Sequence, residues 1–126
     1  MSIRARFTVD RGDFRLDVDL ELPSRGVTSL FGPSGCGKTT LATNIATWFA
    51  DEGARVALAD FDPQGSSLDW LEARKDYEGI PSIEGIDATR DPVKPARGTD
   101  YLIMDAPAGT HGPVINQMLK QVQSLI

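Results

Sequence analysis

Apolar and polar residues alternate strictly along residues 14–22, a pattern that predicts a half-buried β-strand. The inward positions are Phe14, Leu16, Val18, Leu20 and Leu22, and charged residues occupy the positions between them. Successive side chains of a strand point to opposite faces, so one face of this strand is expected to be dry and the other wet. Residues 3–9 predict its antiparallel partner, with residues 10–13 as the turn. The chain therefore begins with an N-terminal antiparallel hairpin.

Short apolar runs and helical periodicity alternate along the rest of the chain. Residues 27–31, 56–61 and 101–104 are apolar runs that predict strands buried on both faces. Helices are predicted over residues 39–51, 67–77 and 113–126, and residues 89–99 predict a proline-bearing loop. Hairpin followed by β-α-β-α-β-α predicts an α/β fold with a short parallel sheet and right-handed crossovers.

Three parallel strands leave a sheet edge, and the last predicted helix has an apolar stripe that needs cover. That stripe consists of Val114, Ile115, Met118, Leu119, Val122 and Ile126. Uncovered edges and apolar faces favour contact with another molecule. We therefore expect the chain to self-associate.

Composition limits the class of protein. The 126 residues suit one domain, 40% are apolar and 25% charged, and no apolar run approaches the about 20 residues that a membrane span needs. The net charge of −5 argues against a nucleic-acid or membrane surface as the main partner. The N-terminal residues do not resemble a signal peptide, and one cysteine fits a reducing cytoplasm. One histidine and one cysteine cannot form a zinc cluster, so any metal is expected on oxygen ligands.

A glycine-rich loop follows the first predicted core strand and precedes a helix. Its sequence fits G-x-x-x-x-G-K-[ST] and continues into a second threonine: Gly32, Pro33, Ser34, Gly35, Cys36, Gly37, Lys38, Thr39 and Thr40. Glycines let backbone N–H groups turn inward around phosphate oxygens, and the helix presents its positive end to them. Lys38 is placed to reach the β- and γ-phosphates of a nucleotide, most simply ATP, and the Thr39 hydroxyl to bind magnesium. The alternative is a glycine-rich turn that matches by chance.

Acidic residues end the other two predicted core strands. Asp105 closes residues 101–105, where it can hold magnesium through water if its strand lies beside the loop; the alternative is an aspartate that only caps a turn. Asp60 and Asp62 end residues 56–62, and alternation places both carboxylates on one side of an extended chain. Close carboxylates repel unless a cation or a proton relieves them, which favours a site over mere solvation.

Two parts of the chain resemble two different families. The hairpin and residues 20–23, 26–28 and 31–40 are similar to the start of an ABC transporter ATPase subunit, particularly of the molybdate-importer kind. From about residue 41, residues 44–46, 55–65 and 100–109 resemble the Par/Min partition ATPases. The string Asp-x-Asp-Pro-Gln-Gly at residues 60–65 is quite specific to that second family.

The resemblance implies a P-loop fold of three α/β/α layers in one truncated domain, residues 1–126. Residues 1–31 would be the ABC-like hairpin and first core strand, and residues 32–126 the loop and the partition-type βα units. Lys38 would bind the phosphates and Thr39 the magnesium. Asp62 would orient the attacking water, and the metal residues beside Thr39 would be Asp60, Asp62 and Asp105. ATP and Mg²⁺ are the implied cofactors.

Departures from both families limit the implied activity. Partition ATPases carry an extra loop lysine that reaches across a dimer, and Pro33 stands in its place. The ABC signature Leu-Ser-Gly-Gly-Gln and the switch histidine are absent, and Ala106 replaces the glutamate that should follow Asp105. The expectation is Mg-ATP binding with weak or no hydrolysis, at most that of a slow ATPase.

Two half-families joined near residue 40 favour a chimera, engineered or made to represent P-loop evolution. A natural truncated or divergent protein is the alternative origin. Two alternative functions stay open, namely an active partition-type ATPase and a structural chimera with no selected activity.

Overall fold

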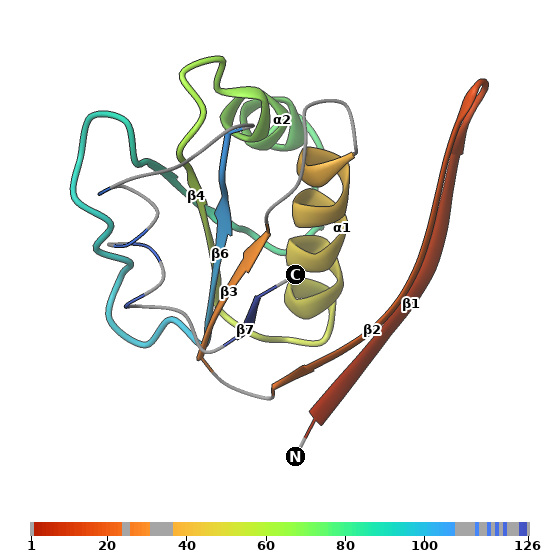
Figure 1. Ribbon diagram of the computed structural model, residues 1–126, viewed down its shortest axis with the longest axis horizontal. Coiled ribbons are helices and arrows are strands. Elements are labelled where there is room, and N and C mark those ends of the chain that lie inside the picture. Colours follow the sequence, from red (N-terminus) through yellow and green to blue (C-terminus); the bar gives the residue numbers. More distant parts are fainter. Residues whose placement is uncertain are drawn as a thin grey trace.

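The computed structural model describes residues 2–23, 26–30, 37–107, 113, 116, 118, 120 and 124–125 (Figure 1). The elements in chain order are β1 (Ser2–Arg11), β2 (Phe14–Pro23), β3 (Gly26–Leu30), α1 (Lys38–Asp51), β4 (Val56–Asp60), α2 (Ser66–Arg74), β5 (Glu84–Asp87), β6 (Tyr101–Asp105) and β7 (Ser124–Leu125). The predicted hairpin, core strands and first two helices are all present, so the α/β class is confirmed.

The hairpin of β1 and β2 forms a two-stranded antiparallel sheet of its own. Its turn is narrower than predicted, because only Gly12 and Asp13 lie between the paired strands. Gly12 has φ 60°, which suits the first central position of a two-residue hairpin turn and which other residues rarely adopt. On the wet face, Arg4 donates two hydrogen bonds to the Asp19 carboxylate, at 2.6 and 2.8 Å. Figure 1 shows the hairpin alongside α1, outside the main sheet.

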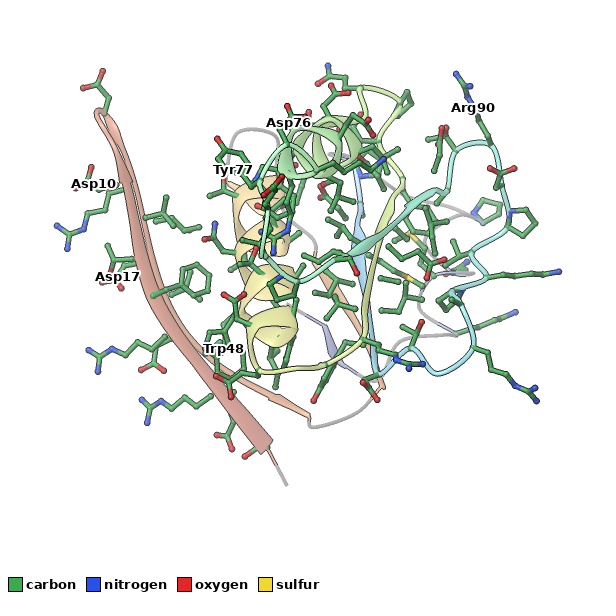
Figure 2. All side chains as sticks on the ribbon, turned by 180° about the vertical axis from the view of Figure 1, so that it is seen from behind. Asp10, Asp17, Trp48, Asp76, Tyr77 and Arg90 are labelled. Atoms are coloured by element: carbon green, nitrogen blue, oxygen red, sulfur yellow. The ribbon has the colours of Figure 1, made fainter. Side chains whose placement is uncertain are left out.

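The dry face of the hairpin is buried, as its alternation predicts. Ala5 and Leu22 have almost no exposed surface, and Phe7 and Leu20 pack against the core cluster that α1 contributes to. Figure 2 shows Trp48 on the side of α1 that faces the hairpin. Helix α1 is therefore covered on one side by the hairpin and on another by the main sheet.

The main sheet has five parallel strands in the order β5-β4-β6-β3-β7. Two core clusters lie on its two faces, because successive residues of β4 alternate between them: Leu58 belongs to the cluster of α1 and α2, and Ala57 and Ala59 belong to the other. Met118, 2% exposed, joins the second cluster from the C-terminal segment. The sheet thus separates two packed layers, as a small P-loop α/β domain requires.

Strands β5 and β7 were not predicted, and they correct the expectation of a three-stranded sheet. In β5 only Ile86 is buried, so its sequence lacks the apolar run that marks β4 and β6. Strand β5 forms because its backbone pairs with β4 in parallel. Among the described residues, the outermost strands of the sheet are therefore β5 and β7.

The predicted helix over residues 113–126 is wrong at its end. Pro113, Asn116 and Met118 are helical, but Ser124 and Leu125 form β7, which pairs in parallel with β3. Backbone hydrogen bonds to the outer side of β3 outweigh the helical spacing of the apolar residues, which expresses a local preference only. The other members of the apolar stripe, Val114, Ile115, Leu119, Val122 and Ile126, lie outside the described residues.

Helix α2 ends earlier than predicted. The N–H groups of Lys75, Asp76 and Tyr77 donate to carbonyl groups three residues back, so the last turns tighten after Arg74. Tyr77, predicted to be the last residue of the helix, lies beyond its end, and 70% of its side chain is exposed. Residues 79–81 then carry the chain away, as the predicted break requires.

Candidate functional site

The carboxyl ends of β4 and β6 lie side by side at one end of the strands. Asp60 and Asp105 are the last residues of these strands and pair in register, and we call this border of the sheet the acidic edge. Their exposed fractions are only 1% and 2%. Ligands of open α/β sheets bind at this edge, outside the carboxyl ends of the strands. The predicted acidic positions therefore converge where a ligand of this fold is expected.

Helix α1 begins at the same edge. Gly37, directly before Lys38, has φ 87°, a left-handed conformation that explains why glycine precedes the lysine. The N-cap residue, Gly37, has no side chain that could accept a hydrogen bond from the N–H groups of the first turn. The first loop residues, Gly32, Pro33, Ser34, Gly35 and Cys36, lie outside the described residues.

A direct hydrogen bond joins the start of α1 to the end of β6. The Thr39 hydroxyl donates to Asp105 Oδ2 at 2.9 Å, although the two residues are 66 positions apart. Two predicted magnesium ligands are thus in contact in the folded chain. The contact places the end of β6 beside the start of α1, and β6 pairs in parallel with β3, the strand that precedes the glycine-rich loop; this is the strand arrangement on which the Asp105 prediction depended.

Asp60 caps the N-terminus of α2 from the end of β4. Its Oδ1 accepts the Asp62 N–H at 2.9 Å, and its Oδ2 accepts the Ser67 N–H at 3.1 Å. Burial raises the pKa of Asp60 and the charge of Asp105 raises it further, against the backbone hydrogen bonds, among them one from Leu68. Both carboxylate oxygens of Asp60, a predicted metal residue, thus accept hydrogen bonds that hold the loop after β4 and the first turn of α2.

Asp62 lies in the loop after β4 and not on an extended strand. The strand ends at Asp60, so the alternation argument that placed both carboxylates on one side does not apply. Asp62 is half-buried, its Oδ1 accepts the Gln64 N–H at 2.9 Å, and its carbonyl accepts the Gly65 N–H. Gly65, the N-cap residue directly before α2, has φ 67°, which accounts for the glycine of the Asp-x-Asp-Pro-Gln-Gly string.

Ser67 was not predicted and belongs to the same group of side chains. It is fully buried, and its hydroxyl donates to Asp105 Oδ2 at 2.5 Å. The sequence offered one signal, because Ser67 lies one helical turn before Leu71 on the buried face of α2. A polar residue on an apolar helix face needs a partner.

The donor set fits magnesium in one particular way. Within the described residues no three His, Cys, Asp or Glu side chains gather to hold a metal. Thr39 and Asp105 supply hard oxygen atoms, and Mg²⁺ commonly takes only one or two protein ligands beside phosphate oxygens and water. These residues therefore fit an ion that arrives with a nucleotide.

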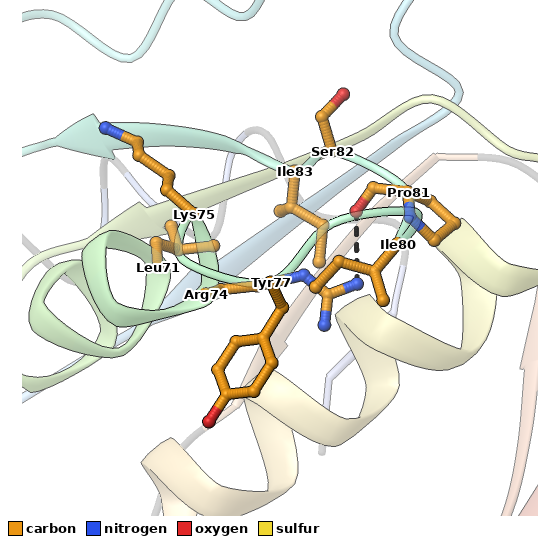
Figure 3. A pocket seen from close by; sticks show the side chains of 8 residues that line it. All are labelled: Leu71, Arg74, Lys75, Tyr77, Ile80, Pro81, Ser82 and Ile83. Atoms are coloured by element: carbon orange, nitrogen blue, oxygen red, sulfur yellow. Dashed lines mark hydrogen bonds between the residues drawn. The ribbon is translucent and has the colours of Figure 1, made fainter.

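A separate cavity of about 270 Å³ lies at the other end of α2 (Figure 3). Arg74 crosses it and donates to the Pro81 carbonyl at 3.1 Å, beside the exposed side chains of Tyr77 and Ile80. Because α2 starts at the acidic edge and ends here, before β5 begins, the cavity lies toward the amino ends of the strands. It is not part of the acidic site.

Comparison with known proteins identifies the class as a nucleotide-binding P-loop domain. Residues 29–125 match the CbiA family, described as the CobQ/CobB/MinD/ParA nucleotide binding domain. The chain belongs to this family. The match begins at residue 29, earlier than the change at residue 41 that the motifs indicated, and so includes the glycine-rich loop.

The second resemblance is also confirmed. Molybdenum import ATP-binding protein ModC of Methylococcus capsulatus is 68% identical over 44 residues, 35% of this chain and 12% of that protein. The Rhodobacter capsulatus ModC is 62% identical over 73 residues, 58% of this chain and 18% of that protein. The chain thus spans less than a fifth of the length of these relatives. No solved structure matches it significantly.

Among the described residues, no helix is long and apolar enough to cross a membrane.

Proposed function

We propose that this chain binds Mg-ATP and hydrolyses it slowly or not at all. The observation that carries the proposal is the 2.9 Å contact between the Thr39 hydroxyl and Asp105, which joins the phosphate-binding loop to the acidic edge of the sheet. Family membership supports nucleotide binding, and the ModC relatives, named as ATP-binding, support ATP as the nucleotide.

Each predicted residue receives a role under this proposal. The backbone of residues 32–40 holds the phosphates, Lys38 neutralises their charge, and Thr39 and Asp105 hold the magnesium, which spreads the charge on the phosphate oxygens. Asp62 orients a water near the terminal phosphate from its loop. Asp60 supports the metal through the α2 cap, since its oxygens already accept backbone N–H groups.

Thermal melting tests the proposal. A ligand that binds only the native state stabilises it by about 2.7 kcal/mol at 100 times its dissociation constant. Saturating Mg-ATP is therefore expected to raise the melting temperature by several degrees, whereas magnesium alone should not. Absence of any shift at millimolar Mg-ATP would reject the proposal and favour a structural chimera without selected activity.

An active partition-type ATPase is the second candidate function, because the family match extends over residues 29–125. Pro33, in place of the trans-acting lysine, argues against it. Steady phosphate release is the measurement: from the wild type we expect at most slow release, well below the about 1 s⁻¹ at the low end of typical enzyme turnover. Sustained release at about 1 s⁻¹ or faster, which Asp62→Ala abolishes and the exposed neighbour Gln64→Ala leaves unchanged, would establish this candidate instead.

We further propose that the two resemblances reflect a chimera that joins an ABC-type N-terminal part to a partition-type remainder within one domain. The single cysteine supports a cytoplasmic location. Strands β5 and β7 are the outermost strands among the described residues, and such sheet edges support self-association. Light scattering that gives a monomer mass at high concentration would refute self-association.

A further inference from the structure

Ser67 connects both buried carboxylates of the acidic edge to one helix. Its hydroxyl donates to Asp105 Oδ2 at 2.5 Å, and its backbone N–H donates to Asp60 Oδ2 at 3.1 Å. The residue has no exposed surface, so water does not compete for either bond. One residue of the first turn of α2 thus contacts the carboxylates that end β4 and β6.

The hydroxyl contact matters because Asp105 Oδ2 accepts two hydrogen bonds, one from Thr39 and one from Ser67. If the Thr39 oxygen turns to magnesium, the Ser67 hydroxyl remains as the donor that fixes the rotation of the carboxylate. Hydrogen bonds from a hydroxyl to a carboxylate are short and about twice as strong as neutral ones. Residues that orient a metal ligand in this way typically affect metal affinity about 10- to 100-fold.

We propose that Ser67 is a positioning residue that orients the Asp105 carboxylate toward the magnesium ion of the bound nucleotide. The inference rests on the proposed function, since it concerns the same site. It adds a residue of α2 to a group formed by Thr39 of α1 and the carboxylates that end β4 and β6. A purely structural Ser67 would tie α2 to the sheet without any effect on magnesium.

Neighbouring serines give a matched pair of variants. Ser67→Ala removes the hydroxyl and keeps the backbone N–H that Asp60 accepts, whereas Ser66→Ala makes the same change at an exposed position of the same turn. Ser67→Cys keeps a single γ atom with a weak S–H donor, on a larger sulfur. All three are checked by circular dichroism and measured below their melting temperatures.

The experiment compares ATP affinity with excess magnesium and with EDTA for the wild type and each variant. We expect Ser67→Ala to reduce the magnesium-dependent gain in affinity about 10-fold or more, with its EDTA affinity unchanged. Ser67→Cys should fall between Ser67→Ala and the wild type, and Ser66→Ala should equal the wild type.

Two results would overturn the inference while leaving the proposed function intact. One is a Ser67→Ala chain that keeps the full magnesium gain; the other is an equal loss of affinity with and without magnesium, which a structural role predicts. If Ser67→Ala does not fold, Ser67→Cys decides by the same comparison. A wild type that binds no ATP in either buffer rejects the proposed function, and the inference with it.

Discussion

Replacing Lys38 with alanine is expected to weaken Mg-ATP binding about 100-fold, through the loss of about 3 kcal/mol of charge-assisted hydrogen bonding to phosphate. Lys38 is the first residue of α1 and follows Gly37, which has a left-handed backbone conformation. The next residue, Thr39, contacts Asp105, so Lys38 lies at the acidic edge. Alanine is the best helix former, so the helix itself should persist. Dissociation constants from calorimetry give the measurement.

Lys75→Ala is the matched control for this variant. Lys75 follows the end of α2, is exposed and pairs with Glu72 at 2.6 Å, far from the acidic edge along the helix. The Lys75→Ala substitution removes the same charge as Lys38→Ala, so any effect of net charge on nucleotide attraction appears in both variants. Affinity of Lys38→Ala within about 3-fold of the Lys75→Ala value, less than 1 kcal/mol, would contradict the phosphate role.

Leu58→Ala is expected to lower the free energy of unfolding by about 2–5 kcal/mol. Leu58 is fully buried at the middle of β4 and packs in the cluster formed with α1 and α2. Since small domains are stable by only about 5–15 kcal/mol, this one substitution removes a large part of the total. Urea unfolding followed by circular dichroism gives the measurement.

Leu16→Ala on the hairpin provides the comparison. Leu16 is half-buried and belongs to neither core cluster, so truncation there should leave little cavity. We expect its effect to stay below about 1 kcal/mol, as for substitutions outside the core. Equal destabilisation by the two variants would show that β4 is not the centre of the core.

Sequence patterns predicted those elements whose local preference agrees with the fold. The strict alternation of β2 and the apolar runs of β4 and β6 each mark how many faces are buried, and the structure buries them accordingly. Strand β5 has one buried side chain, Ile86, so nothing local distinguishes it from a loop. It depends on pairing with β4, which only the folded sheet provides.

The C-terminal segment shows the opposite failure. Apolar residues at helical spacing predicted one helix to the last residue, yet Ser124 and Leu125 pair with β3. Spacing reports which residues share a face, but it contains no information about an available strand edge elsewhere in the chain. Predicting β7 would have required the order of the strands in the sheet, which the helical spacing does not contain.

The candidate site divides in the same way. Motif spacing predicted that Thr39 and Asp105 belong to one site, and the fold brings them into contact. The assignment of Asp60 to the metal stays a prediction; what the fold adds is that its two oxygens accept backbone hydrogen bonds from Asp62, in the loop after β4, and from Ser67, in the first turn of α2. Ser67 escaped prediction because a serine in a first helical turn is common, and only the fold reveals its bond to Asp105.

The central claim is that an ABC-type loop and a partition-type acidic edge together form one Mg-nucleotide site. Equilibrium dialysis of labelled ATP against the folded wild-type chain, with magnesium and with EDTA, tests it most directly. The claim predicts saturable binding of one nucleotide per chain that weakens when magnesium is removed. Absence of saturable binding at millimolar Mg-ATP, with the chain folded throughout, would contradict it.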